Sequence, residues 1–290
     1  MGSNPILSAI CWIYIIFIKI MIRDFQFLLK VILTNRFSYK RKIERLIKKP
    51  FEPEINILNE LCDQNKSSID IGVFRGAYSY RLSELSKKVY GFEPNPIMFK
   101  TLKKNLCKIK KNIEIFNLAL SNQKGSCILK IPIRDDYIYS FRNDGSYFKS
   151  KIPFYKKSYL KFNFEDYYEA GLATIDINNN LNLRKYDEYN VSKNKLDNIL
   201  IRDEIGFIKV DVEGHELECL KGAERILKTY KPNLLIEINK VHNKNYNQIF
   251  KFLKNLHYSC FYYDNKKLIK IFNYDENPRE DYKNFIFKKN

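Results

Sequence analysis

Four residues with ligand-binding chemistry lie around two short apolar runs near the start of the chain. Asp70, Gly72 and Gly76 form the pattern D-x-G-x-x-x-G, and Glu93 follows 23 residues after Asp70. The flanking runs SIDIG and KVYGFE have the length and composition of buried strands. Ligands bind beyond the carboxyl ends of parallel strands, so we expect all four residues at one crevice. An acidic residue at the tip of the second strand can accept both hydroxyls of a ribose, which predicts a nucleoside-containing ligand.

The charge of the ligand distinguishes between the candidate nucleoside-containing ligands. A dinucleotide or a nucleoside triphosphate requires a glycine-rich turn whose N–H groups bind phosphate. Here Asp70 occupies the first of those glycine positions, and no P-loop lysine follows Gly76. We expect the Asp70 carboxylate to point into the crevice, where it would repel pyrophosphate and attract the ammonium and sulfonium groups of S-adenosylmethionine. The pattern favours that cofactor; the alternative is a tight turn in which Asp70 is only a cap.

A second group of reactive residues follows a later apolar run, GFIKVDV. Asp211, Glu213, His215 and Glu216 lie within six residues at its end, and Glu237 ends the next run, NLLIE. Methyl transfer from a sulfonium depends mainly on alignment, but an unactivated hydroxyl acceptor also needs a base. We therefore predict Asp211, Glu213, His215 and Glu237 as catalytic residues, with Asp211 and Glu213 the first choice for positioning the acceptor or removing its proton.

Several alternatives remain open for this group. His215 titrates near neutral pH but could cap the helix that begins there. Glu216 could stabilise the same helix through its dipole. Glu237, or His242 in the loop after it, could face the acceptor or be structural.

The sequence predicts no metal site. Carboxylates are suitable Mg²⁺ ligands, but their spacing here matches no metal-binding pattern. The six cysteines include no C-x-x-C, because the closest two, Cys107 and Cys127, are 20 residues apart. They are typical of buried thiols in a reducing compartment.

Strand-like and helix-like runs alternate beyond residue 50, which indicates an α/β fold with parallel crossovers. Apolar periodicity predicts helices at 77–88, 97–109, 215–228 and 244–256, and a third strand over 113–120. The run GSCILKIPI is interpreted as one strand of a hairpin. Three final strand-like runs, YSCFYYD, KLIKIF and NFIF, predict an antiparallel edge.

The N-terminus and the net charge raise a membrane hypothesis. Residues 5–22 are almost wholly apolar, residues 22–33 resemble an amphipathic surface segment, and cationic residues follow. By the positive-inside rule this arrangement leaves the main domain in the cytoplasm. Residues 5–33 would then hold the protein at the cytoplasmic face of a membrane. The alternative is a helix buried against the domain or a partner. The formal charge of +18 suggests acidic partners, although the lysines are scattered and a nucleic-acid partner is disfavoured.

Six blocks of the sequence resemble the FkbM-type methyltransferases. They are IDIGVFRGAYSYRLSE, VYGFEPNPIMFKTLKKNL, NLALSN, AGLATI, KLDNIL and FIKVDVEGHELECLKGAERIL with KPNLLIEIN, in the family's order between about residues 67 and 240. The resemblance implies S-adenosylmethionine as cofactor and O-methylation of a hydroxyl on a sugar, polysaccharide precursor or natural product. It places Asp70, Gly72 and Gly76 in the cofactor loop, Glu93 at the ribose, and Ala119 and Leu120 near the adenine.

The same resemblance implies a class I, Rossmann-like, doubly wound fold: a mostly parallel seven-stranded sheet with an antiparallel edge. The apolar N-terminus lies outside the core that the family shares, and it predicts an additional N-terminal hydrophobic helix. We predict an N-terminal segment over 1–50 and a methyltransferase domain over 51–290. A Tyr-rich insertion at about 134–190 matches the family only at AGLATI and is the natural place for acceptor specificity.

Three functions are compatible with these features. The favoured one is an O-methyltransferase acting on a sugar, glycan or lipid-linked saccharide. The second is an RNA or DNA methyltransferase, which is weakened because the fourth strand ends in DVEG and not in an N/D-P-P-Y motif. The third is a noncatalytic protein that retains the fold.

Overall fold

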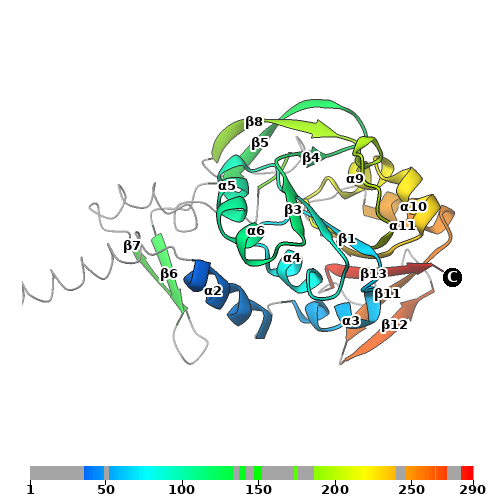
Figure 1. Ribbon diagram of the computed structural model, residues 1–290, viewed down its shortest axis with the longest axis horizontal. Helices are drawn as coiled ribbons and strands as arrows, with labels where there is room; N and C mark the ends of the chain where they lie inside the picture. The colour runs from blue at the N-terminus through cyan, green and yellow to red at the C-terminus, as the bar shows by residue number, and fades with distance from the viewer. Residues whose placement is uncertain are drawn as a thin grey trace, which may run out of the picture.

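A large central sheet organises the chain. The computed structural model describes residues 36–48, 52–132, 137–141, 147–151, 173–175, 186–239, 246–264, 266–272 and 282–289. Eight of its strands form one sheet, in the order β12-β11-β13-β10-β9-β1-β2-β3 (Figure 1). They are β1 (Ser67–Ile71), β2 (Val89–Phe92), β3 (Ile113–Phe116), β9 (Ile205–Val210), β10 (Asn233–Glu237), β11 (Tyr258–Asp264), β12 (Lys267–Ile271) and β13 (Asn284–Lys289).

The sheet is parallel in its centre and antiparallel at one edge. Strands β10, β9, β1, β2 and β3 pair in parallel, whereas β13, β11 and β12 pair antiparallel beside β10. The expected antiparallel edge is confirmed. The expected count of seven strands is wrong, because β12 folds back on β11 from Lys267 opposite Asp264 and adds an eighth strand.

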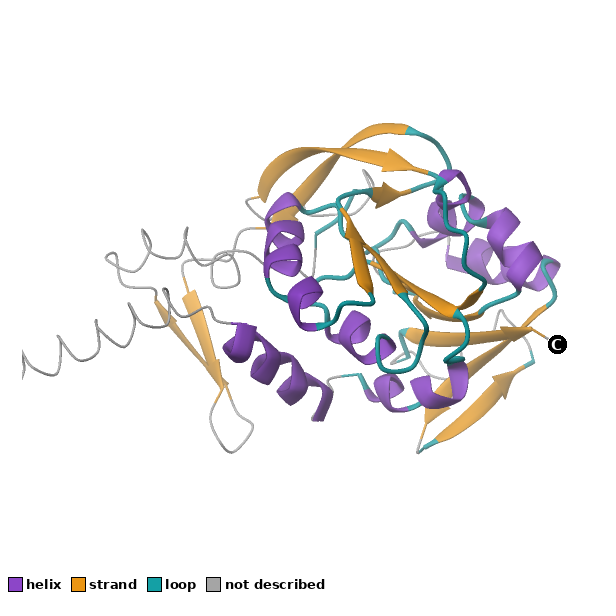
Figure 2. Cartoon of the chain, viewed as in Figure 1, coloured by secondary structure: helices purple, strands orange, loops and turns teal. Residues whose placement is uncertain are grey.

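Helices cover both faces of this sheet (Figure 2), as a doubly wound fold requires. One face packs against α2 (Arg36–Lys48), α4 (Ala77–Leu82), α5 (Pro96–Lys104) and α6 (Leu106–Ile109). The other packs against α9 (Glu216–Lys221), α10 (Glu224–Tyr230) and α11 (Tyr246–Asn255). A 3-10 turn, η1 (Pro53–Asn56), and the short α3 (Leu58–Leu61) lead from α2 into β1.

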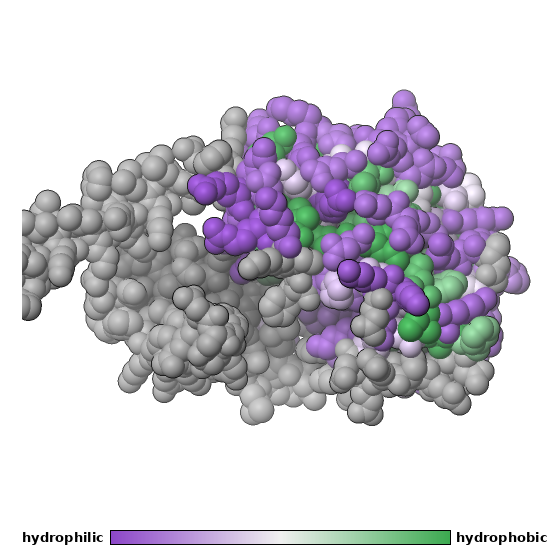
Figure 3. Space-filling view, turned by 90° about the horizontal axis from the view of Figure 1, so that it is seen from below, coloured by the Kyte–Doolittle hydropathy of each residue, from purple (hydrophilic) through white to green (hydrophobic). Residues whose placement is uncertain are grey.

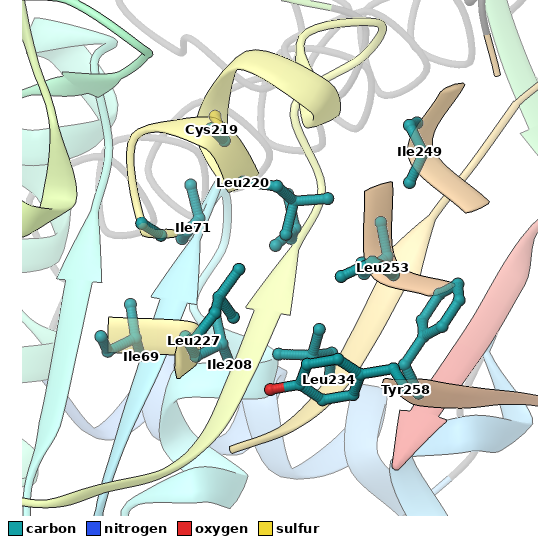
Figure 4. Close-up of a cluster of buried hydrophobic side chains, with 14 of the residues drawn as sticks. Ile69, Ile71, Ile208, Cys219, Leu220, Leu227, Leu234, Ile249, Leu253 and Tyr258 are labelled. Atoms are coloured by element: carbon teal, nitrogen blue, oxygen red, sulfur yellow. The ribbon is translucent and has the colours of Figure 1, made fainter. Parts of the chain in front are cut away.

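Alternation along the central strands divides the core between these faces. Ile69, Ile71 and Ile208 lie in the cluster under α9–α11, and Figure 4 draws them with Leu220 and Leu227 of those helices. Alternate strand residues such as Phe207 and Leu235 belong instead to the cluster under α2, α4, α5 and α6. Buried on both faces, these strands carry apolar residues on both sides, as parallel strands do, and the buried polar exceptions include Ser67, Ser68 and Asp70 of β1 and Lys209 of β9.

Two helices expected as continuous are interrupted. The helix expected over 97–109 breaks at Asn105, between α5 and α6. The helix expected over 215–228 becomes α9 and α10, and Gly222 lies at the break. A Cβ on Gly222 would lie 2.0 Å from the Ser121 carbonyl oxygen. Only a glycine at the break can therefore pack this closely against the Ser121 backbone. The helix expected over 77–88 is shorter and ends at Leu82.

A smaller, three-stranded sheet begins just after the third strand. The strand expected over 113–120 splits, because β3 ends at Phe116 and the two-residue β4 (Ala119–Leu120) joins another sheet. There β4 pairs in parallel with β8 (Tyr186–Asn194), which pairs antiparallel with β5 (Gly125–Pro132). The run GSCILKIPI therefore forms β5, and its antiparallel partner is β8, which begins near the end of the predicted insertion. Within that insertion β6 (Tyr137–Phe141) and β7 (Tyr147–Lys151) form a separate antiparallel pair.

The N-terminal predictions extend beyond the part of the chain that can be described. Residues 5–33 lie outside the described residues, so the hydrophobic helix and the domain division at residue 50 stay predictions. Among the described residues, no helix combines the length and the apolar character needed to cross a membrane. Figure 3 shows the molecule from below the view of Figure 1. The described surface on this side is mostly hydrophilic, and its hydrophobic side chains gather in a strip.

Candidate active site

A pocket opens at the carboxyl ends of β1, β2 and β9, where the sheet topology places ligands. Six of the ten predicted site residues lie in its wall, from both predicted groups: Gly72, Glu93, Ala119, Leu120, Asp211 and Glu213. The wall is completed by Ile71, Phe74, Phe92, Pro94, Leu118, Leu129, Ala173, Ile175 and Val212. The other four predicted residues, Asp70, Gly76, His215 and Glu237, are not in the wall.

Gly72, the first residue after β1, packs closely against the backbone of Asp211, the first residue after β9. Its φ is +85°, and a Cβ there would lie 1.8 Å from the carbonyl oxygen of Asp211. Backbone hydrogen bonds continue past the strand ends, from the Gly72 N–H to Phe92 and from the Asp211 N–H to Ile71, each 3.0 Å. A glycine is therefore needed to bring the strand tips together and form the pocket floor.

Asp70 lies behind this floor and not in the crevice. Its side chain is fully buried and accepts a 2.5 Å hydrogen bond from the hydroxyl of Ser79 on α4. Burial raises its pKa to about 6, against the opposing charge of Lys209. The expectation that its carboxylate points into the crevice is wrong, because the side chain projects from β1 toward α4. Its assignment as a cofactor residue stays a prediction.

Gly76 is needed for packing. It begins α4 with a φ of +80°, and a Cβ there would lie 2.6 Å from Leu106 Cδ2 and 3.1 Å from Leu102 Cδ2. The structure thus places Gly76 against α5 and α6, where its small size allows close contact. Any contact of its backbone with a cofactor remains a prediction.

Glu93 stands at the tip of β2 with its carboxylate fixed. Oε2 accepts from the N–H of Phe74 at 2.8 Å, and Oε1 accepts from the N–H of Asn95 at 2.9 Å. Burial raises its pKa to about 7, although both hydrogen bonds act in the opposite direction. Each carboxylate oxygen has a second lone pair, so the fixed group can still accept two ribose hydroxyls.

The wall beside Glu93 is apolar. Phe92 stacks on Phe116 with ring centroids 5.1 Å apart, and Leu118, Ala119 and Leu120 continue the wall. This surface suits a flat heteroaromatic ring, which agrees with the prediction of an adenine near Ala119 and Leu120.

Residues 173–175, the described end of the block AGLATI, contribute to the pocket. Thr174 pairs with Lys130 of β5 through two backbone hydrogen bonds, and its hydroxyl donates to the Glu213 carbonyl at 2.9 Å. Its neighbours Ala173 and Ile175 lie in the pocket wall. Sequence reasoning assigned them no role, although the match of AGLATI to the family inside a divergent region was a usable signal.

Three carboxylates gather where β9 and β10 end. Burial raises the pKa of Glu213 to about 8, and the negative charges of Asp211 and Glu237 add to the effect. Burial also raises the pKa of Glu237 to about 7, again with the charge of Asp211 contributing. Glu213 has a φ of +49°, an uncommon backbone conformation for a residue other than glycine. The predicted pair Asp211 and Glu213 therefore shares one side of the pocket, and Glu237 is coupled to both electrostatically.

His215 and Glu216 have structural contacts in this region. His215 Nε2 lies 3.0 Å from Ser121 Oγ, and the residue precedes the first turn of α9 without a side-chain cap bond. Glu216 is buried and accepts from the Gly214 N–H at 2.9 Å, which supports the loop before the helix. His242 lies outside the described residues. No group of three or more acidic, histidine or cysteine side chains within the described residues could hold a metal ion.

A family model for the methyltransferase FkbM domain matches residues 62–260. The chain belongs to the FkbM methyltransferase family. The matched range contains all ten predicted site residues and the whole pocket wall. The resemblance read from the six sequence blocks is thereby confirmed, and this FkbM methyltransferase uses S-adenosylmethionine as its methyl donor.

Solved structures and curated proteins were also compared. A methyltransferase FkbM from Methylobacillus flagellatus KT is 17% identical, with a TM-score of 0.43; the match covers 78% of this chain and 44% of that chain. SMU.1697c from Streptococcus mutans, solved with SAH, is 14% identical, with a TM-score of 0.40 and coverage of 82% and 97%. An rRNA methylase from Streptococcus thermophilus is 13% identical, with a TM-score of 0.39 and coverage of 83% and 97%. No curated protein matches.

The pocket of this FkbM methyltransferase fits the cofactor in chemistry. Glu93 offers fixed acceptors for the ribose, the wall from Leu118 to Leu120 offers an apolar surface for the adenine, and Asp211 offers an anion for a cationic donor. The absence of a Cβ at Gly72 lets the Asp211 backbone approach between these two ends of the pocket. These residues would hold the donor with its charged end toward Asp211 and Glu213.

Proposed function

We propose that this methyltransferase transfers a methyl group to a hydroxyl of a sugar, glycan or lipid-linked saccharide. One observation carries the proposal: Glu213 lies in the pocket wall beside Asp211, in surroundings that raise its pKa to about 8. A carboxylate with that pKa is a much better proton acceptor than an ordinary glutamate. An alcohol acceptor needs such a group, because its proton must leave as the new bond to carbon forms.

The two wall carboxylates have different tasks in this proposal. Asp211 Oδ2 forms an ion pair of 2.7 Å with Lys209 Nζ, which holds the carboxylate in place, and Asp211 supplies negative charge for the cationic donor. Glu213 has carboxylates as its neighbours and can take up the hydroxyl proton of the acceptor. Glu237 adds negative charge beside both. When bound, S-adenosylmethionine supplies an activated methyl group, and the chain's contribution is alignment and proton removal.

The acceptor class is tested by following the methyl group. The full-length protein is incubated with S-adenosylmethionine labelled in its methyl group and with separate cell fractions of glycans, lipids and RNA. Alkali-stable label in the glycan or saccharide–lipid fraction, lost with Glu213→Gln, is expected. Label in RNA would favour the nucleic-acid alternative instead, and binding of the donor without labelling of any fraction would favour the noncatalytic one.

We also propose that the protein works at an anionic membrane surface. Helix α2 buries Ile43 against α4 and α6 and exposes cations on its other side: Lys40, Arg41, Lys42, Arg45 and Lys48. The apolar stretch 5–22 precedes this helix in the sequence. A basic helix face beside an apolar segment suits a bilayer that contains anionic lipid and presents lipid-linked saccharides.

Vesicle sedimentation tests this second proposal. The full chain should sediment with phosphatidylcholine vesicles that contain phosphatidylglycerol and much less with pure phosphatidylcholine. Arg45→Glu with Lys48→Glu should weaken binding by about tenfold or more, since each cation near the surface contributes about 1 kcal/mol. The matched pair Lys104→Glu with Lys108→Glu, on α5 and α6, makes the same charge change. Equal losses in both pairs would contradict a specific role for α2.

A further inference from the structure

Lys209 is a charged side chain in the middle of the central sheet. It belongs to β9, is 3% exposed, and lies in register between Asp70 of β1 and Leu235 of β10. Removing an ammonium group from water is costly unless nearby charges compensate it. Its surroundings must therefore offset that cost.

Carboxylates from several elements surround this ammonium. Lys209 Nζ lies 2.7 Å from Oδ2 of Asp211 and 4.5 Å from the centre of the Tyr78 ring. The Tyr78 hydroxyl donates to Glu52 Oε2 at 2.7 Å. Burial lowers the pKa of Lys209, but the charges of Asp211, Asp70 and Glu52 outweigh it, and the pKa ends above its ordinary value. The side chain is a permanent cation.

The position of this cation relative to the pocket is informative. Lys209 is absent from the pocket wall, whereas Asp211, the first residue after β9, lies in the wall. The backbone pairing with β1 continues to Asp211, and the two side chains meet although only Asp211 lines the pocket. The contact orients a wall residue although the lysine is not itself in the wall.

We propose that Lys209 is a positioning residue that holds the Asp211 carboxylate in the pocket wall, where Asp211 attracts the cationic end of the methyl donor. The inference rests on the proposed roles of Asp211 and Glu213. Without this ion pair, Asp211 would lose the contact that orients it, beside the negative charges of Glu213 and Glu237.

Other charged or titratable groups face this pair. Every comparison is therefore made between a variant and the unmodified protein at the same pH. In the described part of the chain, the charged or titratable groups around Lys209 and Asp211 are Asp70 on β1, Glu93 after β2, Tyr78 on α4, Glu237 on β10, and Glu52, Glu213 and Lys283 in connecting segments.

The test measures affinity for S-adenosylmethionine by calorimetry and needs no acceptor. Relative to the unmodified protein, Lys209→Met should weaken binding by about tenfold or more, because the Asp211 carboxylate is no longer held toward the donor. Lys209→Arg, which keeps the cation, should bind nearly as the unmodified protein does. A lysine that only supports the fold would instead lower the Tm without a loss of affinity that depends on Asp211.

Three controls make the result decisive. Lys228→Met removes an exposed lysine that also pairs with a carboxylate, Glu224 at 2.6 Å, and should leave the affinity unchanged. In an Asp211→Asn background, Lys209→Met should lose most of its effect on affinity. If Lys209→Met fails to fold, Lys209→Met with Asp70→Asn removes one of the uncompensated buried charges and is measured instead.

Two outcomes would overturn the inference. They are an affinity of Lys209→Met equal to that of the unmodified protein, and an undiminished effect of Lys209→Met in the Asp211→Asn background. Neither depends on the acceptor, so a failed glycan assay with the expected binding profile would refute only the proposed substrate class.

Discussion

The two halves of the pocket both contain buried carboxylates but hold them in different ways. At the end of β2, Glu93 receives two backbone N–H groups, from Phe74 and Asn95. At the ends of β9 and β10, the charges that act most on Glu213 and Glu237 are those of other carboxylates. The same residue type therefore occurs in a rigid, hydrogen-bonded setting and in a crowded, repulsive one.

This difference separates binding from proton transfer. Backbone donors fix the orientation of Glu93, which suits the recognition of a ribose. Repulsion between carboxylates makes the charge of Glu213 and Glu237 variable near neutral pH, which suits proton uptake. Lys209 makes Asp211 the exception in the second half, because it gives that carboxylate a permanent cation. Single substitutions test whether the two groups of carboxylates have these different roles.

Glu213→Gln should have the largest effect. Loss of a general base lowers the rate by about 10²–10⁴-fold, while affinity for S-adenosylmethionine should change little. In the unmodified protein, activity should rise with pH through about 8, because Glu213 must be ionised to accept a proton. The measurement is kcat/KM against pH, and that rise should be absent in the variant. An unchanged rate would remove Glu213 from the chemistry.

Glu93→Ala should act on binding instead. Hydrogen bonds to a charged group contribute about 1.5–3 kcal/mol each, so affinity for S-adenosylmethionine should fall by about 10–100-fold with kcat at saturation nearly unchanged. Calorimetry measures the affinity. A melting curve serves as the control, because the variant also loses the Phe74 and Asn95 contacts. Unaltered affinity would show that the ribose lies elsewhere.

Glu237→Gln should increase stability at alkaline pH. The folded protein raises the pKa of Glu237 to about 7, so its stabilising contribution is complete below the ordinary value near 4.5 and is lost as pH rises through 7. Glutamine does not titrate, and the variant's Tm should exceed that of the unmodified protein near pH 8 by about 2–4 °C. Near pH 5 the two should coincide. The exposed Glu204→Gln is the matched control, and a gain of the same size there would contradict the electrostatic explanation.

His215→Gln should have the smallest effect. The imidazole contacts Ser121 and is not in the pocket wall, so we expect a loss of less than about fivefold, the equivalent of one ordinary hydrogen bond. Steady-state rates at several pH values provide the measurement. A loss as large as that of Glu213→Gln would make His215 the base.

The central elements were predictable because their signals are local. The runs SSIDI, KVYGF and NLLIE have the length and composition of buried strands, whichever strands they pair with. The spacing from Asp70 to Glu93 follows from one strand–helix–strand unit. The two groups of site residues were predictable for the same reason, since parallel strands end at one edge. Strand β8 was not predicted, because its burial alternates only in part and its pairing with β5 spans some 60 residues of divergent chain.

Side-chain direction was decided by packing. Asp70 has the sequence position of a crevice residue, yet Ser79 and Lys209 draw it behind the floor. Gly72 and Gly76 read as ligand-binding glycines, whereas the structure requires them for the approach of Asp211 and Leu106. Lys209 had a signal in principle, a single lysine inside the apolar run GFIKVDV, but its partner could not be read from that run alone.

The order of residues thus specified the strands, the edge at which their acidic tips meet, the family and the cofactor, because each depends on short-range patterns. The three-dimensional packing specified which of those acids reach the pocket, which are fixed by backbone N–H groups, and which titrate. A charge responds to everything within a few ångströms, and residues from β1, β9, β10 and α4 become neighbours only when the chain folds.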